Sequence, residues 1–188
     1  MREFVYFSRK AATTGNFNDL MKAGRMDIVC HVVIMSLFIS NNVRNNVRLH
    51  LFFYGQPDPP KHLEIMANPN ISKKDIAGLI KRMLFKYKPG KKTEAFENCF
   101  VEKKSLIKFV EEAKDKNFYI LDKDGENIRN VDIKENPIFI LGDHEGIDKK
   151  ELKRLSKSAK KVSLGKVNYF SSQVVTILNN ELDIRGIE

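Results

Sequence analysis

The stretch PIFILGD, residues 137–143, constrains the fold of this chain more than any other. It is continuously apolar up to Gly142, whereas a strand with one face in water alternates apolar and polar residues. In a chain whose predicted strands alternate with helices, such a strand is typical of a parallel sheet covered on both faces. We therefore predict an α/β protein with a parallel sheet flanked by helices. Its 188 residues suffice for one substantial core, so residues 1–188 are expected to form a single domain.

The remaining elements are predicted from hydrophobic periodicity and from end signals. Ser72 stands at the N-cap position of an amphipathic helix, and Asp148 and Glu151 have the spacing of a capping box. KHLEIM (61–66) is predicted to be a short strand at an edge of the sheet, because it follows the turn QPDPP. The predicted strands are 2–8, 47–55, 61–66, 118–122, 137–143 and 159–165, and the predicted helices are 25–42, 71–85, 105–117, one from Asp148, and 171–182.

Composition narrows the partners and the location. Lys and Arg total 33 against 24 Asp and Glu, a net charge of +9 that favours polyanions such as nucleic acid, although a merely lysine-rich protein has the same balance. Cys30 and Cys99 lack C-x-x-C spacing, so neither a disulfide framework nor a zinc site is indicated. The longest apolar stretch, residues 26–39, is too short and too polar to span a bilayer, and the N-terminus has no signal-peptide pattern. We expect a cytoplasmic protein with no membrane association.

The segment FILGDHEGI (138–146) admits three interpretations. A metal site is disfavoured, because adjacent residues on a turn point apart and no H-E-x-x-H spacing accompanies them, so no metal is expected. A catalytic carboxylate pair of Asp143 and Glu145 is disfavoured, because such pairs normally come from different elements. Gly142 and Gly146 instead bracket a turn at the carboxyl end of a buried parallel strand, where α/β sheets bind ligands. A sharp strand-to-helix turn remains the alternative.

A second strand that ends in glycine favours the ligand interpretation. VSLG ends in Gly165, and VNYFSSQ leads from it into a helix, so two such strands and a small-residue helix start are expected to converge on one cavity. The chain contains neither G-x-G-x-x-G nor G-x-x-x-x-G-K-[ST], which argues against a Rossmann fingerprint and a P-loop.

Three segments together resemble the SPOUT class of S-adenosylmethionine-dependent RNA methyltransferases. They are FSRKAATTGNFNDLMKAGRMDIVCHVV (7–33), FILGDHEGI (138–146) and KKVSLGKVNYFSSQVVTILNNELD (160–183). Within this class, TTGNFNDLMKAGRMD (13–27) resembles the archaeal tRNA pseudouridine-54 N1-methyltransferase family. The resemblance implies methylation of N1 of pseudouridine 54 in the tRNA T-loop, with S-adenosylmethionine as cofactor. It also implies a homodimer and a deep C-terminal trefoil knot, a topology that is rare in general.

The resemblance also implies which residues form the site. The cofactor region is expected at about 118–188, where small and apolar side chains suit a cavity in which backbone groups grip adenine and ribose. The cofactor-binding residues it implies are Leu141, Gly142, Gly146, Ser163, Leu164, Gly165, Ser171, Ser172, Gln173 and Val174.

Asp143 and Arg25 are the expected catalytic residues. Ring N1 of pseudouridine carries a free N–H, so the reaction needs N1 aligned with the methyl group and a group that receives the N1 proton. Asp143 is expected to accept a hydrogen bond from N1–H; because an ordinary aspartate has a pKa of about 3.9, orientation is favoured over full proton abstraction. Asp143 could instead only cap the turn amides. Arg25 is expected on a phosphate or on the flipped base, with a solvated side chain as its alternative.

The basic segment 147–166 adjoins the predicted pocket and is expected to contact tRNA phosphates in the T-arm. The expected substrate-binding residues are Arg9, Asp27, Lys149, Lys153 and Arg154. Two other functions stay open at this point. The enzyme could modify ribosomal RNA pseudouridine, or the chain could be a non-catalytic basic RNA-binding module.

Overall fold

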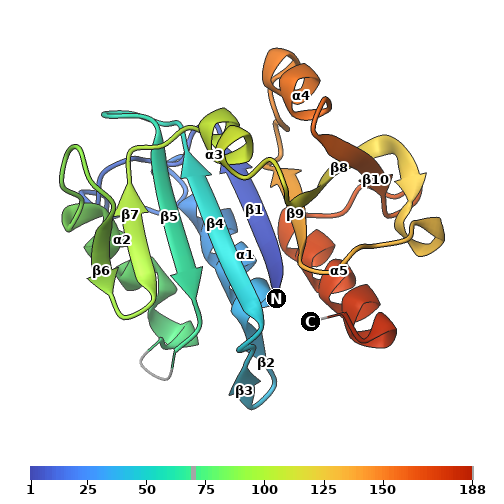
Figure 1. Ribbon diagram of the computed structural model, residues 1–188. Helices are drawn as coiled ribbons and strands as arrows, with labels where there is room; N and C mark the ends of the chain where they lie inside the picture. Colours follow the sequence, from blue (N-terminus) through green and yellow to red (C-terminus); the bar gives the residue numbers. More distant parts are fainter. Residues whose placement is uncertain (69–70, 188) are drawn as a thin grey trace.

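The computed structural model describes residues 1–68 and 71–187, and it contains one eight-stranded sheet with the strand order β10-β8-β9-β1-β4-β5-β7-β6 (Figure 1). A separate two-stranded hairpin joins β2 (Phe38–Ile39) to β3 (Asn42–Val43). The strands of the large sheet are β1 (Arg2–Ser8), β4 (Val47–Phe53), β5 (Lys61–Met66), β6 (Thr93–Phe96), β7 (Cys99–Glu102), β8 (Asn117–Asn127), β9 (Pro137–Gly142) and β10 (Ala159–Ser163).

The predicted parallel strand is confirmed. β9 lies between β1 and β8 and runs parallel to both, and its residues from Pro137 to Leu141 are all buried. β1 also pairs in parallel with β4, and β10 with β8, so five neighbouring strands share one direction. Their carboxyl ends therefore lie at the same edge of the sheet.

The antiparallel part of the sheet differs from the prediction. β5 was expected at an edge, but it lies between β4 and β7, with antiparallel pairing on both sides. The unpredicted hairpin of β6 and β7 covers it and takes the edge position. The expectation for residues 61–66 was therefore right about the strand and wrong about its place.

The helices cover both faces. Apolar residues of α1 (Met26–Leu37), α2 (Ile76–Phe85) and α5 (Ser171–Arg185) pack into one core cluster, and those of α3 (Leu106–Glu112) and α4 (Lys149–Leu155) pack into another on the opposite face. The α/β architecture with a largely parallel sheet between helices is thus confirmed. None of the helices described in 1–68 and 71–187 is long and apolar enough to cross a membrane.

Several element boundaries differ from the prediction. The Ser72 hydroxyl accepts the Lys74 amide at 3.3 Å and caps a short 3-10 turn, Lys73–Asp75, so α2 begins only at Ile76. A second 3-10 turn spans Ile128–Asn130. Helix α3 ends at Glu112, earlier than expected, and β8 continues to Asn127, because after a register shift it still pairs with β10.

Asp148 caps α4 as predicted, but the capping box is not formed. The Asp148 carboxylate accepts the Lys150 amide at 2.8 Å. Glu151 instead accepts a hydrogen bond of 3.3 Å from the Tyr54 hydroxyl, which ties α4 to the segment after β4.

The last helix is fixed to the first strand through Arg2. The Arg2 side chain is buried, with 2% exposed, and donates to the Asp183 carboxylate at 2.7 Å and to the Ile187 carbonyl at 2.6 Å. The Asn179 carbonyl accepts a third bond at 3.1 Å. Because a buried guanidinium needs such partners, Arg2 sets the position of α5 on the sheet and with it the start of α5 near the end of β9.

Candidate active site

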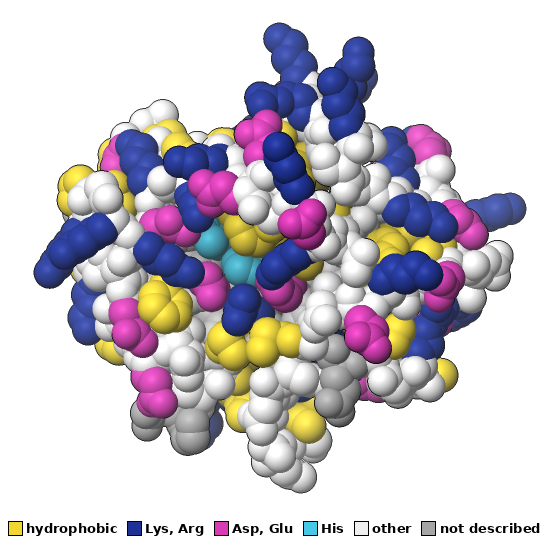
Figure 2. All heavy atoms as spheres, viewed as in Figure 1, with side chains coloured by type: hydrophobic (Ala, Val, Ile, Leu, Met, Phe, Trp, Pro, Cys, Tyr) yellow, Lys and Arg dark blue, Asp and Glu magenta, His cyan; other side chains and the backbone are white. Residues whose placement is uncertain are grey.

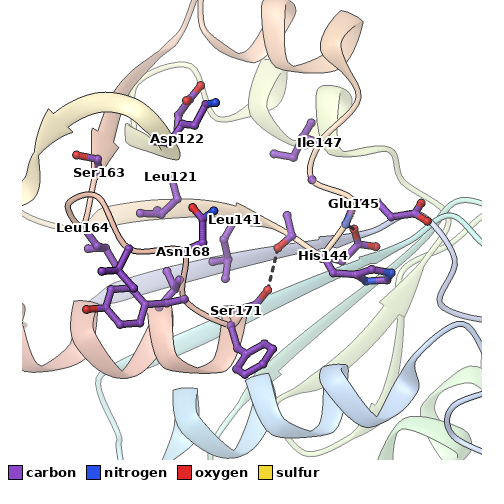
Figure 3. Close-up of a pocket in the computed structure, with 18 of the residues that line it drawn as sticks. Leu121, Asp122, Leu141, His144, Glu145, Ile147, Ser163, Leu164, Asn168 and Ser171 are labelled. Atoms are coloured by element: carbon purple, nitrogen blue, oxygen red, sulfur yellow. Dashed lines mark hydrogen bonds between the residues drawn. The ribbon is translucent and has the colours of Figure 1, made fainter.

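A cavity of about 760 Å³ lies at the carboxyl ends of β9 and β10, beside the start of α5 (Figure 3). This volume falls in the range of small-molecule sites, which run from about 300 to 1,000 Å³. Most of the predicted cofactor-binding residues line it. They are Leu141, Gly142, Gly146, Ser163, Leu164, Gly165, Ser171 and Val174.

Ser172 and Gln173 were also expected at the cofactor, but the structure does not place them on the cavity wall. Gln173 Oε1 accepts the Phe170 amide at 3.0 Å and thus caps the start of α5. The Ser172 carbonyl accepts the Thr176 hydroxyl at 3.0 Å. Both residues therefore stabilise the first turn of α5, which begins at Ser171 in the site.

The glycines allow the turn after β9 to fold back on the strand. A Cβ at Gly142 would lie 2.9 Å from the backbone of Gly146, closer than real Cβ contacts allow. Gly146 has a φ of +73°, and its amide donates to the Asp143 carbonyl at 2.9 Å. The conformation of 142–146 therefore needs glycine at both ends, which agrees with the expectation that these two residues shape the loop.

Three chain segments meet at the cavity: the turn after β9, the segment after β10 and the start of α5. The Ser171 hydroxyl donates a hydrogen bond of 3.0 Å to the Gly142 carbonyl and joins the start of α5 to the end of β9. In Figure 3, Leu121 and Leu141 lie between the Ser163–Leu164 segment on one side and the His144–Ile147 segment on the other. Apolar side chains with exposed backbone groups between them suit a flat heteroaromatic ring and its sugar.

Sequence reasoning missed part of the cavity wall on β8. Leu121 and Asp122 line the cavity, and Lys161 donates to the Asp122 carboxylate at 2.7 Å. This hydrogen bond lowers the pKa of Asp122, so an ionised acceptor stands at the wall. Such a carboxylate suits the hydroxyl groups of a ribose. The signal was weak, because Asp122 could be recognised as a strand end but the position of β8 beside β9 could not.

Asp143 lines the cavity and joins two strand ends. Its Oδ2 accepts the Arg9 amide at 3.0 Å and the Ser8 hydroxyl at 3.2 Å, and its Oδ1 accepts the Glu145 amide at 2.9 Å. The residue is 9% exposed. A carboxylate has about four acceptor positions, so three bonds leave capacity for one more donor. The turn-capping role is therefore present, and it is compatible with the binding of a substrate N–H.

Arg25 and Asp27 lie near Asp143 but outside the cavity wall. Arg25 has a φ of +64° at the start of α1, and its Nε and Nη2 each donate to the Asp27 carboxylate at 3.0 Å. Burial raises the pKa of Tyr6 above its ordinary range, and the negative charges of Asp143 and Asp27 raise it further. Tyr6 therefore lies close to both Asp143 and the Arg25–Asp27 ion pair. Ile28, in the first turn of α1, reaches the cavity itself. The pair therefore flanks the Asp143 side of the site.

The other predicted substrate residues lie on the segments that follow β1 and β9. Arg9 Nη2 lies 3.8 Å from the Asp148 carboxylate, and Lys10 forms an ion pair with Glu145. Lys149, Lys153 and Arg154 are exposed on α4, with Arg154 donating to Glu111 at 3.0 Å. Ile147 and Leu152 line the cavity. The helix α4 therefore adjoins the cavity through Leu152, whereas its basic residues Lys149, Lys153 and Arg154 do not line the cavity wall.

Comparison with known proteins identifies the family of this chain. Residues 1–187 match the protein family described as "Putative SAM-dependent RNA methyltransferase". The tRNA (pseudouridine(54)-N(1))-methyltransferase of Methanococcoides burtonii is 35% identical, over 97% of this chain and 96% of its own. The enzyme of the same name from Methanocaldococcus jannaschii is 33% identical, over 100% of this chain and 98% of its own.

The fold is also found among solved structures. Nep1 from Archaeoglobus fulgidus, crystallised with S-adenosylhomocysteine, superposes with a TM-score of 0.66, over 98% of this chain and 99% of that chain, at 14% identity. This likeness concerns the fold alone. Because the family match and the relatives both span nearly the whole sequence, the chain belongs to the family of S-adenosylmethionine-dependent RNA methyltransferases that includes these archaeal tRNA (pseudouridine(54)-N(1))-methyltransferases.

Proposed function

We propose that the protein transfers the methyl group of S-adenosylmethionine to N1 of pseudouridine 54 in the T-loop of tRNA. The full-length relatives with this name support the reaction and the substrate. The single structural observation that carries the proposal is the position of Asp143, on the wall of a cavity formed by the predicted cofactor residues.

The residues of the cavity fit the cofactor. Leu121, Leu141 and Leu164 provide apolar walls, and Asp122 provides an acceptor for ribose hydroxyls. When bound, S-adenosylmethionine supplies an electrophilic methyl group on a sulfonium. The surrounding residues hold it against the target base, and such alignment can account for about 7–11 kcal/mol of a reaction barrier.

Asp143 orients the target base. Its remaining acceptor position receives N1–H of pseudouridine and thereby fixes the orientation of the ring in the cavity. A cofactor held by Leu121, Leu141 and Leu164 would supply the methyl group for N1, and Asp143 would hold N1–H while its proton is released to solvent. A positioned group of this kind contributes about 10²–10⁴ in rate.

The remaining expected residues bind the RNA. Arg25, oriented by Asp27, contacts a phosphate or the flipped base, and Arg9 with Lys149, Lys153 and Arg154 neutralises T-arm phosphates. Phe170 is 75% exposed at the cavity mouth, and Tyr169 lies beside it, so either ring can stack on a base that has left its stack. A C-terminal trefoil knot over about 118–188, a homodimer and a cytoplasmic location complete the proposal; two free, buried cysteines support a reducing compartment.

The test uses S-adenosylmethionine labelled in the methyl group and two T-arm RNAs that differ only in pseudouridine or uridine at the target position. Label is expected only in the pseudouridine RNA and is expected to fall sharply in Asp143→Ala. Asp132→Ala removes an exposed aspartate outside the cavity and should retain full transfer.

Other outcomes separate the alternatives. Cofactor binding without transfer to either T-arm RNA would contradict the T-loop assignment and direct the search to ribosomal RNA. Absence of cofactor binding would favour the non-catalytic RNA-binding module.

A further inference from the structure

A buried row of polar side chains crosses the sheet on the face that carries α3. Glu3 of β1, His50 of β4, His62 of β5 and Glu102 of β7 are joined end to end. Glu3 Oε2 lies 2.8 Å from His50 Nε2, His50 Nδ1 lies 2.9 Å from His62 Nε2, and His62 Nδ1 lies 3.0 Å from Glu102 Oε1. The proposed methyl transfer uses none of these residues.

The two carboxylates fix the imidazole tautomers. Glu102 faces Lys104 at 3.1 Å as well as His62. Glu3 likewise accepts Lys116 at 2.7 Å as well as His50. Because a carboxylate accepts hydrogen bonds, each outer ring nitrogen, His50 Nε2 and His62 Nδ1, is placed to donate to its carboxylate.

The two inner nitrogens, His50 Nδ1 and His62 Nε2, face each other across 2.9 Å. A proton between them forms an N–H···N hydrogen bond, and a metal ion that binds imidazole can take the place of that proton. The rings cannot turn away freely, because His62 stacks on Phe52 and His50 packs against Phe109.

We propose that His50 Nδ1, His62 Nε2 and the Glu64 carboxylate form a binding site for a divalent transition metal of the zinc class. One ligand atom from each of the three residues lies within 4.8 Å of the others. The arrangement also supplies the outer shell of a metal site, in which a ligating histidine donates its other N–H to a carboxylate. Glu3 and Glu102 fill this role on the two sides.

The present spacing is close to what such a metal requires. Two nitrogens bound to one Zn²⁺ at about 2.0–2.1 Å and at a tetrahedral angle lie about 3.3 Å apart. The rings therefore need to separate by a few tenths of an ångström. Glu64 already accepts Lys92 at 2.6 Å and faces Arg48 at 3.5 Å, and its carboxylate retains acceptor positions for a metal.

The surrounding charges restrict which cations can bind. Arg48, Lys92, Lys104 and Lys116 balance the carboxylates of Glu3, Glu64, Glu102 and Glu112, so the site holds no excess negative charge. Mg²⁺ and Ca²⁺ prefer oxygen ligands and bind largely through such charge, whereas Zn²⁺, Ni²⁺ and Cu²⁺ bind well to imidazole. We therefore expect binding of metals that prefer nitrogen and none of Mg²⁺.

The site is close to the surface. Figure 2 shows histidine at the centre of this face, surrounded by basic, acidic and hydrophobic side chains. His50 and His62 are each 2% exposed, so a metal can enter through a small movement of the long side chains around them. The expectation of no metal rested on spacing along the chain; pairing of β4 with β5 brings the two histidines together from positions twelve residues apart.

The test measures Zn²⁺ uptake by the metal-depleted protein with isothermal titration calorimetry. We expect one Zn²⁺ per chain, an affinity at least about 100-fold weaker in His62→Gln, and a loss of about 10–100-fold in Glu102→Gln, which removes only an outer partner. His31→Gln, in an exposed histidine of α1, is the matched control and should bind like the wild type. MgCl₂ should give no binding signal.

A second measurement on the unaltered protein guards against variants that fail to fold. Zn²⁺ is expected to shift the ¹⁵N resonances of His50 Nδ1 and His62 Nε2 and to leave the outer N–H signals in place. No uptake by the wild type, equal uptake by folded His62→Gln, or a proton between the inner nitrogens that Zn²⁺ fails to displace would each overturn the proposal.

Discussion

Asp143 and Arg9 are joined by a hydrogen bond of 3.0 Å from the Arg9 amide to the Asp143 carboxylate, which links the loops that follow β9 and β1. Asp143→Asn keeps the size of the side chain but replaces one acceptor oxygen with an NH₂ donor. This donor would face either the Arg9 amide or the Glu145 amide, which are donors themselves. We expect a loss of about 1–3 kcal/mol in the free energy of unfolding, because a buried donor loses its acceptor. Urea denaturation measures it, with Asp132→Asn as an unaffected control; equal stability would contradict the role of these hydrogen bonds.

Gly142→Ala is expected to damage cofactor binding. Its Cβ would lie 2.9 Å from the Gly146 backbone, so the turn that closes the cavity must move. We expect affinity for S-adenosylhomocysteine to fall at least about tenfold, which corresponds to about 1.4 kcal/mol of binding free energy. Gly90→Ala, in a distant turn with a φ of +77° and open space around it, is the control and should alter stability only. Calorimetric titration of each variant with S-adenosylhomocysteine measures the affinity, and an unchanged affinity in Gly142→Ala would contradict the prediction.

Arg25→Met is expected to weaken use of the RNA and to leave cofactor binding intact, because Arg25 lies beside the cavity and not on its wall. Loss of a charge-assisted hydrogen bond corresponds to a decrease of about 10–100-fold in kcat/KM for the T-arm RNA. Arg82→Met breaks a comparable exposed ion pair with Asp75 and should change neither value. A fall in cofactor affinity with unchanged kcat/KM would refute this division of roles.

The basic helix α4 is expected to determine the salt dependence of RNA binding. Replacement of Lys149, Lys153 and Arg154 by Ala should lower the slope of log affinity against log salt by about 0.7–0.9 for each phosphate that is no longer neutralised. The control replaces Lys73, Lys74 and Lys88 near α2, which lies at the other end of the sheet from α4 (Figure 1). Equal slopes for both triple variants would show that the charge effect is not local to the cavity.

Asp58 makes stability depend on acidic pH. Lys103 forms an ion pair with its carboxylate and Lys61 donates to it at 2.6 Å, and these bonds lower the pKa of Asp58 to about 2. Because the pKa of Asp58 is lower in the folded protein than in the unfolded chain, the unfolded chain binds more protons at pH values between these two pKa values. The stabilisation is therefore complete above pH about 4 and is lost as pH falls toward 2.

Lys103→Met tests this origin of the shift. The variant should raise the pKa of Asp58 toward its ordinary value, as followed by the ¹³C carboxyl resonance. Lys108→Met removes an exposed lysine that pairs with Glu112 and should leave the titration of Asp58 unchanged. A wild-type midpoint at the ordinary aspartate value would show that the two lysines do not hold the carboxylate.

The sequence predicted those parts of the fold whose pattern is local. β9 was recognised because Pro137 to Leu141 are uninterrupted by polar residues, and α2 because its apolar residues recur at helical spacing. β6 and β7 were missed, since Thr93–Glu102 mixes charged and apolar residues; β7 pairs with β5, and β6 pairs with β7.

Those parts of the site that lie within a single loop could be predicted from the sequence. Gly142 ends β9, Gly146 closes the turn after it and Gly165 follows β10, which ends at Ser163 and not at 165 as predicted; all three glycines line the cavity. Leu121 and Asp122 were missed, because the sequence does not show which strands are neighbours in the sheet, and so does not show that β8 lies beside β9. The contact between His50 and His62 was missed for the same reason.

β1 lies inside the sheet, between β4 and β9, and Ser8 meets Asp143 across 135 residues of sequence. During synthesis, β1 and β4 leave the ribosome long before β9 exists, so the β9 side of β1 remains an open strand edge for most of translation. Open edges invite pairing with other chains. The Ser8–Asp143 hydrogen bond can form only once β9 has been made, so the candidate site is completed late in synthesis, and an incomplete chain would lack that site and be prone to aggregate.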